Sequence, residues 1–295
     1  MVKVAVVTVN YNRPGDTVEL LNSISHSDLA SASLLVVDNG STDNSVKILQ
    51  KAFPGLKIIE TGSNLGFAGG YNFGMAQALE SGSDMVLIIN NDTIVPEVFL
   101  QPLMLSLENR PNVAAVAPKT YRGTPCDVKK TIWWVGGTIN LPYGQITNIG
   151  AGKIDGGQFK NSLNCDYLSG VAILFRSNVL KEVGLFDRRF VHTGEDVDLS
   201  LRLRKKGYDL VCCPEAILWH KVSRTGGGED SPFHLYNLEK SRILLMRKWG
   251  FWKGLVSFVK LLPLMLRRMG GVWWRTKNWR LWGALIHGWY DGAYL

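Results

Sequence analysis

The sequence predicts an α/β fold in which a mostly parallel sheet is flanked by helices. Short apolar runs rich in β-branched residues alternate with segments of helical period, and the linking segments are short. This alternation is typical of parallel strands joined by helical crossovers. Hydrophobic residues make up 46% of the 295 residues and charged residues 20%, so the chain can fill a core and is not intrinsically disordered.

Each expected strand is a short run of valine, isoleucine, leucine and similar residues. The first run is almost continuously apolar, as is usual for a strand that is buried on both faces. The strands are expected at 2–9, 34–37, 56–59, 85–89, 113–117, 167–175 and 208–213.

Helices are expected between these strands, where apolar residues recur every three or four positions. One opens at 14–16 and another begins at Pro96, since proline is tolerated in the first turn of a helix. Asp43 is placed to cap a helix that carries Leu49. Two further helices are expected at 69–79 and 194–206.

Residues 119–165 interrupt this alternation. They are rich in glycine, threonine, asparagine and aromatic residues, with glycine pairs at 136–137 and 156–157. This composition favours hairpins or a long excursion over the active site.

The segment 240–295 differs in composition from the rest of the chain. It carries 11 of the 33 lysines and arginines, seven of the ten tryptophans and one acid, Asp291. The net charge of +8 therefore divides into +10 for this segment and −2 for the remainder, and it does not indicate a nucleic-acid partner. The apolar run 255–266 is shorter than the roughly 20 residues of a spanning helix. We expect a helical extension that lies on an anionic membrane surface or packs as a cap on the domain before it.

The cysteines and the N-terminus indicate a reducing compartment. None of the four cysteines has C-x-x-C spacing, so free thiols are expected at Cys126, Cys165, Cys212 and Cys213. The apolar run at the N-terminus ends at Thr8, without the pattern of a signal peptide. The expected location is the cytoplasm.

Polar residues follow two of the expected strands, at the edge where α/β sheets bind ligands. Asp38 follows the strand 34–37 and can accept hydrogen bonds from a base or a ribose, or cap a helix. Asp92 follows the strand 85–89. It can hold Mg²⁺ or Mn²⁺ together with phosphate oxygens of a ligand, or cap the helix at Pro96, as Thr93 also can.

Two further segments carry candidate chemistry. Residues 64–74 are glycine-rich but match neither the dinucleotide fingerprint nor the P-loop, so the glycines either admit a ligand or allow close helix–sheet packing. Glu195, Asp196 and Asp198 open a predicted helix. They can complement the helix dipole, or one of them can face the crevice as a general base. His220 is either structural or a neutral metal ligand.

Six segments occur in an order that is specific to one superfamily. They are 6–12 (VVTVNYN), 37–43 (VDNGSTD), 64–70 (NLGFAGG), 89–92 (INND), 168–170 (LSG) and 194–202 (GEDVDLSLR). Together they resemble an inverting glycosyltransferase of family two with the Rossmann-like GT-A fold. They are most similar to the rhamnosyltransferase-like branch that builds bacterial cell-surface polysaccharides. The resemblance covers roughly residues 3–225.

The resemblance implies a role for each matching residue. Asp196 is the implied catalytic base, and Glu195 is the next candidate. Asp92 and His220 are the implied metal ligands for Mg²⁺ or Mn²⁺. The first acid of the D-x-D motif is replaced by Asn90, which leaves one carboxylate in the motif. Contacts to the nucleotide donor are implied for Thr8, Asn10, Asp38, Asn64, Gly66, Asn72 and Asn91.

The implied reaction moves a sugar from a nucleotide-diphosphate donor to a hydroxyl of a glycan or polyprenyl-linked acceptor. It belongs to the synthesis of cell-surface polysaccharide, such as cell wall or O-antigen. The expected donor is dTDP-rhamnose, with a UDP-hexose second. The GT-A domain is expected at 1–239, with 119–165 near the acceptor side. The extension 240–295 is expected to attach the protein peripherally to the inner face of the plasma membrane.

Two alternatives remain open from the sequence. A nucleotidyltransferase would carry a basic, glycine-rich signature after the first strand, where this chain has only Arg13. A non-catalytic, membrane-docked sugar-binding or scaffold protein need not retain Asp92, Glu195 and Asp196.

Overall fold

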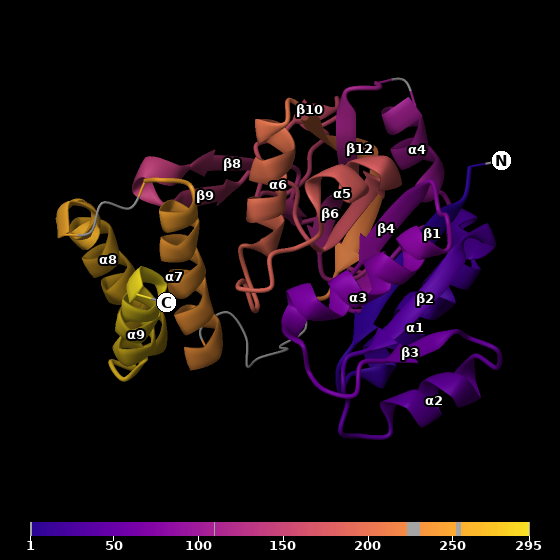
Figure 1. Ribbon diagram of the computed structural model, residues 1–295, viewed down its shortest axis with the longest axis horizontal. Helices are drawn as coiled ribbons and strands as arrows, with labels where there is room; N and C mark the ends of the chain where they lie inside the picture. The colour runs from indigo at the N-terminus through magenta and orange to yellow at the C-terminus, as the bar shows by residue number, and fades with distance from the viewer. Residues whose placement is uncertain (1, 109, 223–230, 252–254, 295) are drawn as a thin grey trace. The chain divides into compact units, whose positions relative to one another are not determined.

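The computed structural model describes residues 2–108, 110–222, 231–251 and 255–294. These residues form two compact units, whose elements are labelled in Figure 1. The sheet unit contains residues up to 138 together with 148–189 and 195–222, and the helical unit contains 139–147, 190–194 and the residues from 231 onward.

The sheet unit is built on one mixed sheet. Its strand order is β10-β12-β6-β11-β4-β1-β2-β3, with β5 paired to β12 and β7 to β6. The bounds are β1 Val4–Asn10, β2 Ser33–Asp38, β3 Ile58–Glu60, β4 Met85–Ile89, β5 Thr93–Ile94, β6 Val113–Arg122, β7 Ile132–Trp134, β10 Leu163–Asn164, β11 Ala172–Arg176 and β12 Asp209–His220.

The α/β class is confirmed, and the sheet is less parallel than the sequence predicts. Strands β3, β2, β1 and β4 are parallel to one another, and β12 is parallel to β6. Strand β11, however, is antiparallel to both of its neighbours, β4 and β6. The short strands β5, β7 and β10 are also antiparallel to their partners.

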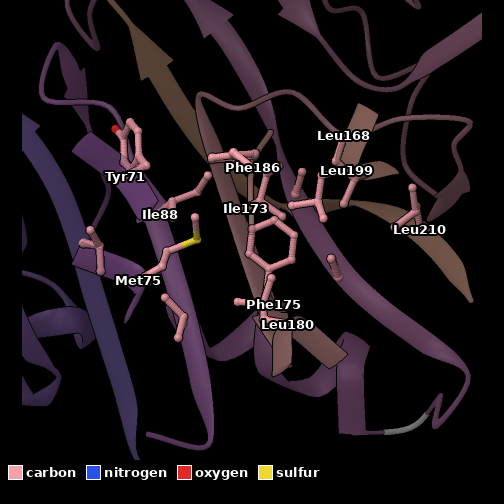
Figure 2. Close-up of a cluster of buried hydrophobic side chains, with 14 of the residues drawn as sticks. Tyr71, Met75, Ile88, Leu168, Ile173, Phe175, Leu180, Phe186, Leu199 and Leu210 are labelled. Atoms are coloured by element: carbon pink, nitrogen blue, oxygen red, sulfur yellow. The ribbon is translucent and has the colours of Figure 1, made fainter. Parts of the chain in front are cut away.

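Helices cover both faces of this sheet, because each central strand is apolar on both sides. On β1, for example, Val6 belongs to one buried cluster and Val7 to the other. Figure 2 shows residues of the cluster to which Val7 belongs, among them Met75, Phe175 and Leu199. The helices of this unit are α1 Pro14–Ser25, α2 Ser45–Ala52, α3 Gly66–Glu80, α4 Leu100–Glu108, α5 Ser177–Val183 and α6 Glu195–Lys205, with a short 3-10 helix, η1, at Asp28–Ser31.

Helix α3 lies unusually close to the sheet at Gly74. A Cβ atom on Gly74 would lie 2.4 Å from Cγ1 of Val7 and 2.9 Å from Cγ2 of Val37. At this position, therefore, the glycine of the 64–74 segment serves helix–sheet packing.

Several element boundaries differ from the sequence prediction. Helix α4 begins at Leu100 rather than at Pro96, and the carboxylate of Asp28 accepts hydrogen bonds from the amides of residues 99–101. Thr93 lies in β5 instead. Strand β12 continues past a bulge to His220, well beyond the expected end at 213, and β11 begins only at Ala172.

The helical unit contains three long helices and a hairpin. The helices are α7 Pro232–Lys248, α8 Leu255–Thr276 and α9 Leu281–Tyr294, and the hairpin joins β8 Gly137–Asn140 to β9 Gln145–Asn148 through a short 3-10 helix, η2, at Leu141–Tyr143. Helix α9 packs closely on α7 at two glycines. A Cβ atom on Gly288 would lie 2.4 Å from the carbonyl oxygen of Tyr236, and one on Gly292 would lie 2.7 Å from that of Lys240.

Two sequence expectations about composition can be compared with this fold. All four cysteines are free thiols, and only Cys126 is exposed. Among the described helices, none combines the length and apolar composition needed to cross a bilayer.

Candidate active site

A buried hydrogen-bond network joins the carboxyl ends of β1 and β2. Asn10 and Asp38 are paired in the parallel register, and Nδ2 of Asn10 donates to Oδ1 of Asp38 at 2.9 Å. Ser41 donates to the same carboxylate through its hydroxyl at 2.7 Å and its amide at 2.9 Å. These three donors fix the carboxylate of Asp38 at the ligand-binding edge of the sheet. Asp43, not Asp38, accepts from the amide of Ser45, the first residue of α2, at 2.9 Å.

Thr17 extends this network to β4. Its hydroxyl donates to Oδ1 of Asn10 at 2.8 Å and accepts from Nδ2 of Asn91 at 3.0 Å. Thr8 precedes Asn10 by two positions on β1 and therefore shares its face of the strand. The hydroxyl of Thr8 is buried and has no hydrogen-bond partner among the described residues. The structure thus brings Thr8, Asn10, Asp38 and Asn91 to one edge.

The glycine-rich segment is held to the same edge by Asn39. Nδ2 of Asn39 donates to Oδ1 of Asn64 at 3.2 Å and to the carbonyl of Gly66 at 3.1 Å. Gly66 has φ +72°, a conformation that favours glycine. Asn72 has a different environment, because its amide group bonds the backbone of Phe186 as both donor and acceptor, at 2.8 and 2.9 Å.

Asp92 and His220 lie beside each other because β5 pairs with the end of β12. Oδ1 of Asp92 is 3.2 Å from Nε2 of His220, and both residues are buried. Nδ1 of His220 has no hydrogen-bond partner in the described part of the chain. The ring of Trp133 contacts that of His220 edge-on, with the centroids 4.9 Å apart.

This pair fits a divalent cation. Two adjacent ligands of an octahedral ion, each about 2.1 Å from the metal, lie about 3.0 Å apart. The oxygen–nitrogen distance of 3.2 Å between Asp92 and His220 is close to that value. No group of three or more potential ligands occurs among the described residues.

Glu195 and Asp196 begin α6 and have different environments. Glu195 is buried, and its Oε2 has no hydrogen-bond partner among the described residues. Burial raises the pKa of Glu195 well above its usual range, and the charge of Asp196 raises it further. Asp196 is half-buried and accepts at 2.8 Å from the amides of both Gly170 and Val197. Burial raises the pKa of Asp196 as well, but these two amides oppose the rise.

The surroundings therefore raise the pKa of Glu195 more than that of Asp196. Like charges on adjacent carboxyls disfavour double ionisation, and the proton favours the group whose charge is less well solvated. By its hydrogen bonds that group is Glu195, and the two amide donors favour the charged form of Asp196.

The third acid of this segment is structural. Asp198 accepts from Nε of Arg202 at 2.9 Å, and the same guanidinium donates to the carbonyls of residues 183–185. This arrangement fixes α6 to the end of α5.

Tyr71 is buried, and its hydroxyl contacts the end of β4. Its hydroxyl donates to the carbonyl of Ile89 at 3.0 Å and to Oδ1 of Asn90 at 2.9 Å. Burial raises the pKa of Tyr71 well above its usual range, and the charge of Asp92 raises it further. Asn90, at the position of the missing acid, is thus a hydrogen-bond acceptor for Tyr71.

Sequence reasoning did not single out several of these residues. Tyr71, Ser41 and Gly170 stand inside or beside the quoted segments, so proximity to those segments could have found them. Thr17 lies in the first helix, outside every segment, and only the fold brings it to Asn10.

Comparison with known sequences identifies relatives over most of the chain. The family model described as "Glycosyl transferase family 2" matches residues 5–184. An N-acetylglucosaminyl-diphospho-decaprenol L-rhamnosyltransferase of Mycobacterium tuberculosis is 28% identical over 270 residues, covering 84% of this chain and 86% of the relative. The galactofuranosyltransferase GlfT1 of the same species is 26% identical over 72% of this chain and 68% of the relative.

Solved structures share the fold at low sequence identity. GalNAc-T7, solved with UDP, GalNAc and Mn²⁺, has a TM-score of 0.63 at 14% identity over 82% of this chain. This chain spans only 47% of GalNAc-T7. The mannosyltransferase PcManGT from Pyrobaculum calidifontis, solved with GDP-Man and Mn²⁺, has a TM-score of 0.56 at 16% identity over 97% of this chain and 73% of its own. These neighbours have the GT-A fold, and the family match covers more than half of the residues. The chain is therefore a member of glycosyltransferase family 2.

Proposed function

We propose that this glycosyltransferase inverts the anomeric carbon of its donor in a single displacement, with Asp196 as the base. The observation that carries this proposal is the unequal pair at the start of α6. Asp196 accepts two amide hydrogen bonds, whereas Oε2 of Glu195 has no partner among the described residues. An acceptor hydroxyl is a poor nucleophile until its proton is removed, and a positioned base accelerates such a step by about 10²–10⁴-fold.

The remaining polar residues are proposed to bind the donor. Asn10, Asp38 and Thr8 would contact the base and ribose, while Asn64, Gly66 and Asn91 would lie along the nucleotide. Asn72 is left out, because its amide group is engaged by the backbone of Phe186. Asp92 and His220 would hold Mg²⁺ or Mn²⁺, which when bound neutralises charge on the leaving diphosphate.

The donor and acceptor are proposed from the named relatives. The 28% identical relative is named as a rhamnosyltransferase that acts on an N-acetylglucosaminyl-diphospho-decaprenol. We therefore propose dTDP-rhamnose as the first donor to test and a UDP-hexose as the second. The proposed acceptor is a lipid-linked glycan of cell-surface polysaccharide synthesis.

The proposed division of labour follows the composition of the chain. Residues 1–239 would carry the transfer chemistry, and residues 240–295 would attach the protein peripherally to the inner face of the plasma membrane. Residue 239 lies within α7, so this division is functional rather than a break between helices.

Thermal shift measurements with nucleotides test the donor site. The panel contains dTDP, UDP, GDP and ADP, each with Mg²⁺, Mn²⁺ or EDTA. A ligand that binds only the folded state raises the melting temperature. We expect a pyrimidine diphosphate to give the largest rise, and EDTA to abolish it. If no nucleotide stabilises the protein under any condition, the donor site is refuted and a non-catalytic sugar-binding role gains support.

The role of Asp196 is tested in transfer assays. Asp196→Asn should lower kcat by about 10²–10⁴-fold and leave the nucleotide-induced thermal shift in place. Asp209→Asn is a matched control, because Asp209 is exposed at the start of β12 and its carboxylate accepts only a surface hydrogen bond from Asn112 among the bonds described. Full activity of Asp196→Asn would refute the assignment.

A further inference from the structure

Helices α8 and α9 expose large aromatic and aliphatic side chains along one side each. On α9, Trp282, Ile286, Tyr290 and Tyr294 follow one another at intervals of four, so they lie on one face of the helix. We call the whole exposed set the aromatic face; it consists of Leu262, Leu266, Trp273, Trp274, Trp279, Trp282, Ile286, Tyr290 and Tyr294.

Other residues of the same helices form the core of the helical unit. Met269 and Val272 of α8 pack with Leu281 and Leu285 of α9 in one buried cluster. The aromatic face is therefore additional to the apolar surface that holds the helices together. Trp274 is 72% exposed, Trp279 66% and Tyr294 73%, and large aromatic residues gathered at one surface are uncommon on a protein surface that faces only water.

Basic residues are interleaved with this face. Arg267, Arg275, Lys277 and Arg280 are exposed, and Nζ of Lys277 lies 4.1 Å from the ring centroid of Trp274. From residue 255 to the end of the chain, the sequence has one acid, Asp291. That acid accepts a hydrogen bond from the hydroxyl of Tyr236.

The interior of this unit is, by contrast, partly ionic. The buried carboxylate of Glu239 accepts from Nη1 of Arg242 at 2.9 Å and from Nε1 of Trp289 at 2.6 Å, and it also pairs with Arg268. Charged groups thus lie inside while most of the tryptophans of α8 and α9 lie outside. A buried carboxylate with exposed tryptophans is unusual for a helical unit surrounded only by water.

We propose that the aromatic face docks on an anionic lipid bilayer, with α8 and α9 lying in the plane of the interface. Tryptophan and tyrosine favour the headgroup region, and interleaved arginine and lysine pair with anionic headgroups. A second copy of the chain is a poorer occupant, because a two-fold contact would set the same basic face against itself. This inference names the surface for the membrane attachment proposed above.

Vesicle sedimentation tests the proposal with the full chain and no substrate. Vesicles of phosphatidylcholine alone are compared with vesicles that also contain phosphatidylglycerol. We expect binding to the anionic vesicles that weakens with salt and little binding to the neutral ones. Failure of the unaltered protein to bind anionic vesicles would overturn the proposal.

Two double variants and a matched control locate the surface. Arg267→Glu with Arg280→Glu should weaken binding more than tenfold, since each basic residue near such a membrane strengthens binding about fivefold. Trp274→Ser with Trp279→Ser should also weaken it. Lys47→Glu with Lys51→Glu makes the same charge change on exposed positions of α2, and it should bind much more tightly than the arginine variant. Equal binding by the arginine variant and the α2 control would refute this surface.

Two further measurements distinguish membrane docking from donor binding and from self-association. All variants should keep the nucleotide-induced thermal shift, so a failed donor site and a failed membrane surface give different results. Light scattering without vesicles reports self-association. A dimer that the tryptophan variant abolishes, together with no vesicle binding, would assign the aromatic face to a second copy and overturn the lipid proposal.

Discussion

Replacing Glu195 with glutamine should change how the stability of the protein depends on pH. Burial raises the folded-state pKa of Glu195 well above 4.5, so the folded protein holds a proton that the unfolded chain releases. The contribution of Glu195 to the free energy of unfolding is therefore fully present below its unfolded pKa, and it is lost as the pH rises towards its folded pKa. Glutamine resembles the protonated acid and has no such dependence.

The size of the effect follows from proton linkage. One proton that is bound only in the folded state costs about 1.4 kcal/mol of stability for each pH unit between the two pKa values. The difference in unfolding free energy between the unaltered protein and Glu195→Gln should therefore grow by about that amount per unit above pH 4.5. The variant should be the more stable protein at neutral pH.

Urea denaturation at several pH values between 5 and 8 measures this difference. Burial, and secondly the charge of His234, lowers the pKa of His192 to about 4. His192 therefore gives an opposite trend, since its contribution to stability is lost as the pH falls. That trend is common to both proteins and cancels in the difference. Glu182→Gln is a matched control, because hydrogen bonds from Tyr208 and Lys206 lower the pKa of Glu182. Its contribution changes only below pH 4.5, so the difference for this variant should stay level from pH 5 to 8. Parallel curves for the unaltered protein and Glu195→Gln would refute the neutral state of Glu195.

Three further predictions concern the metal ligands and the core. His220→Asn should weaken Mn²⁺ binding in the presence of nucleotide about 10–100-fold, and unchanged binding in calorimetry would exclude His220 as a ligand. Asn90→Asp restores the absent acid and should strengthen Mn²⁺ binding, because affinity rises with the number of charged ligands; the same titration checks this. Gly74→Ala should lower the unfolding free energy by about 1–3 kcal/mol through the clash with Val7, whereas Gly15→Ala, with nothing within 4 Å of its new methyl group, should not.

The sequence predicts well those elements whose structure is determined by neighbouring residues in the chain. Strands β2 and β4 contain the apolar runs 34–37 and 85–89, and the polar residues that follow these runs mark the edge of the candidate site. Asp38 and Asp92 could be located in this way, because the carboxyl end of a parallel strand is a ligand-binding position in any α/β sheet.

The parts that the sequence does not predict depend on distant residues. The start of α4 is set by Asp28, which lies more than 70 residues earlier and binds the amide of Gln101. The antiparallel direction of β11 leaves no trace in its composition, since a buried strand is apolar in either direction. Strand β12 reaches His220 only after a bulge beyond Cys213, and a local pattern does not reveal that the strand resumes.

The protonation of the acidic pair also lies beyond the sequence. Glu195 and Asp196 are adjacent and chemically alike, so their order in the chain does not distinguish acid from base. The amide of Gly170, which comes from a separate segment, makes the difference in the structure.

Each unit is made of separate segments of the chain, and this affects the order in which the two units can fold during synthesis. The sheet unit is complete once residue 222 has emerged, whereas the helical unit collects 139–147 and 190–194 and still requires α9. Glycines 288 and 292 of α9 pack it against α7 only after α9 has been made. Because domains fold as units and the earlier-made part folds first, the proposed donor site can form before α9 is synthesised. The aromatic face is then assembled later than the sheet that carries the proposed donor site.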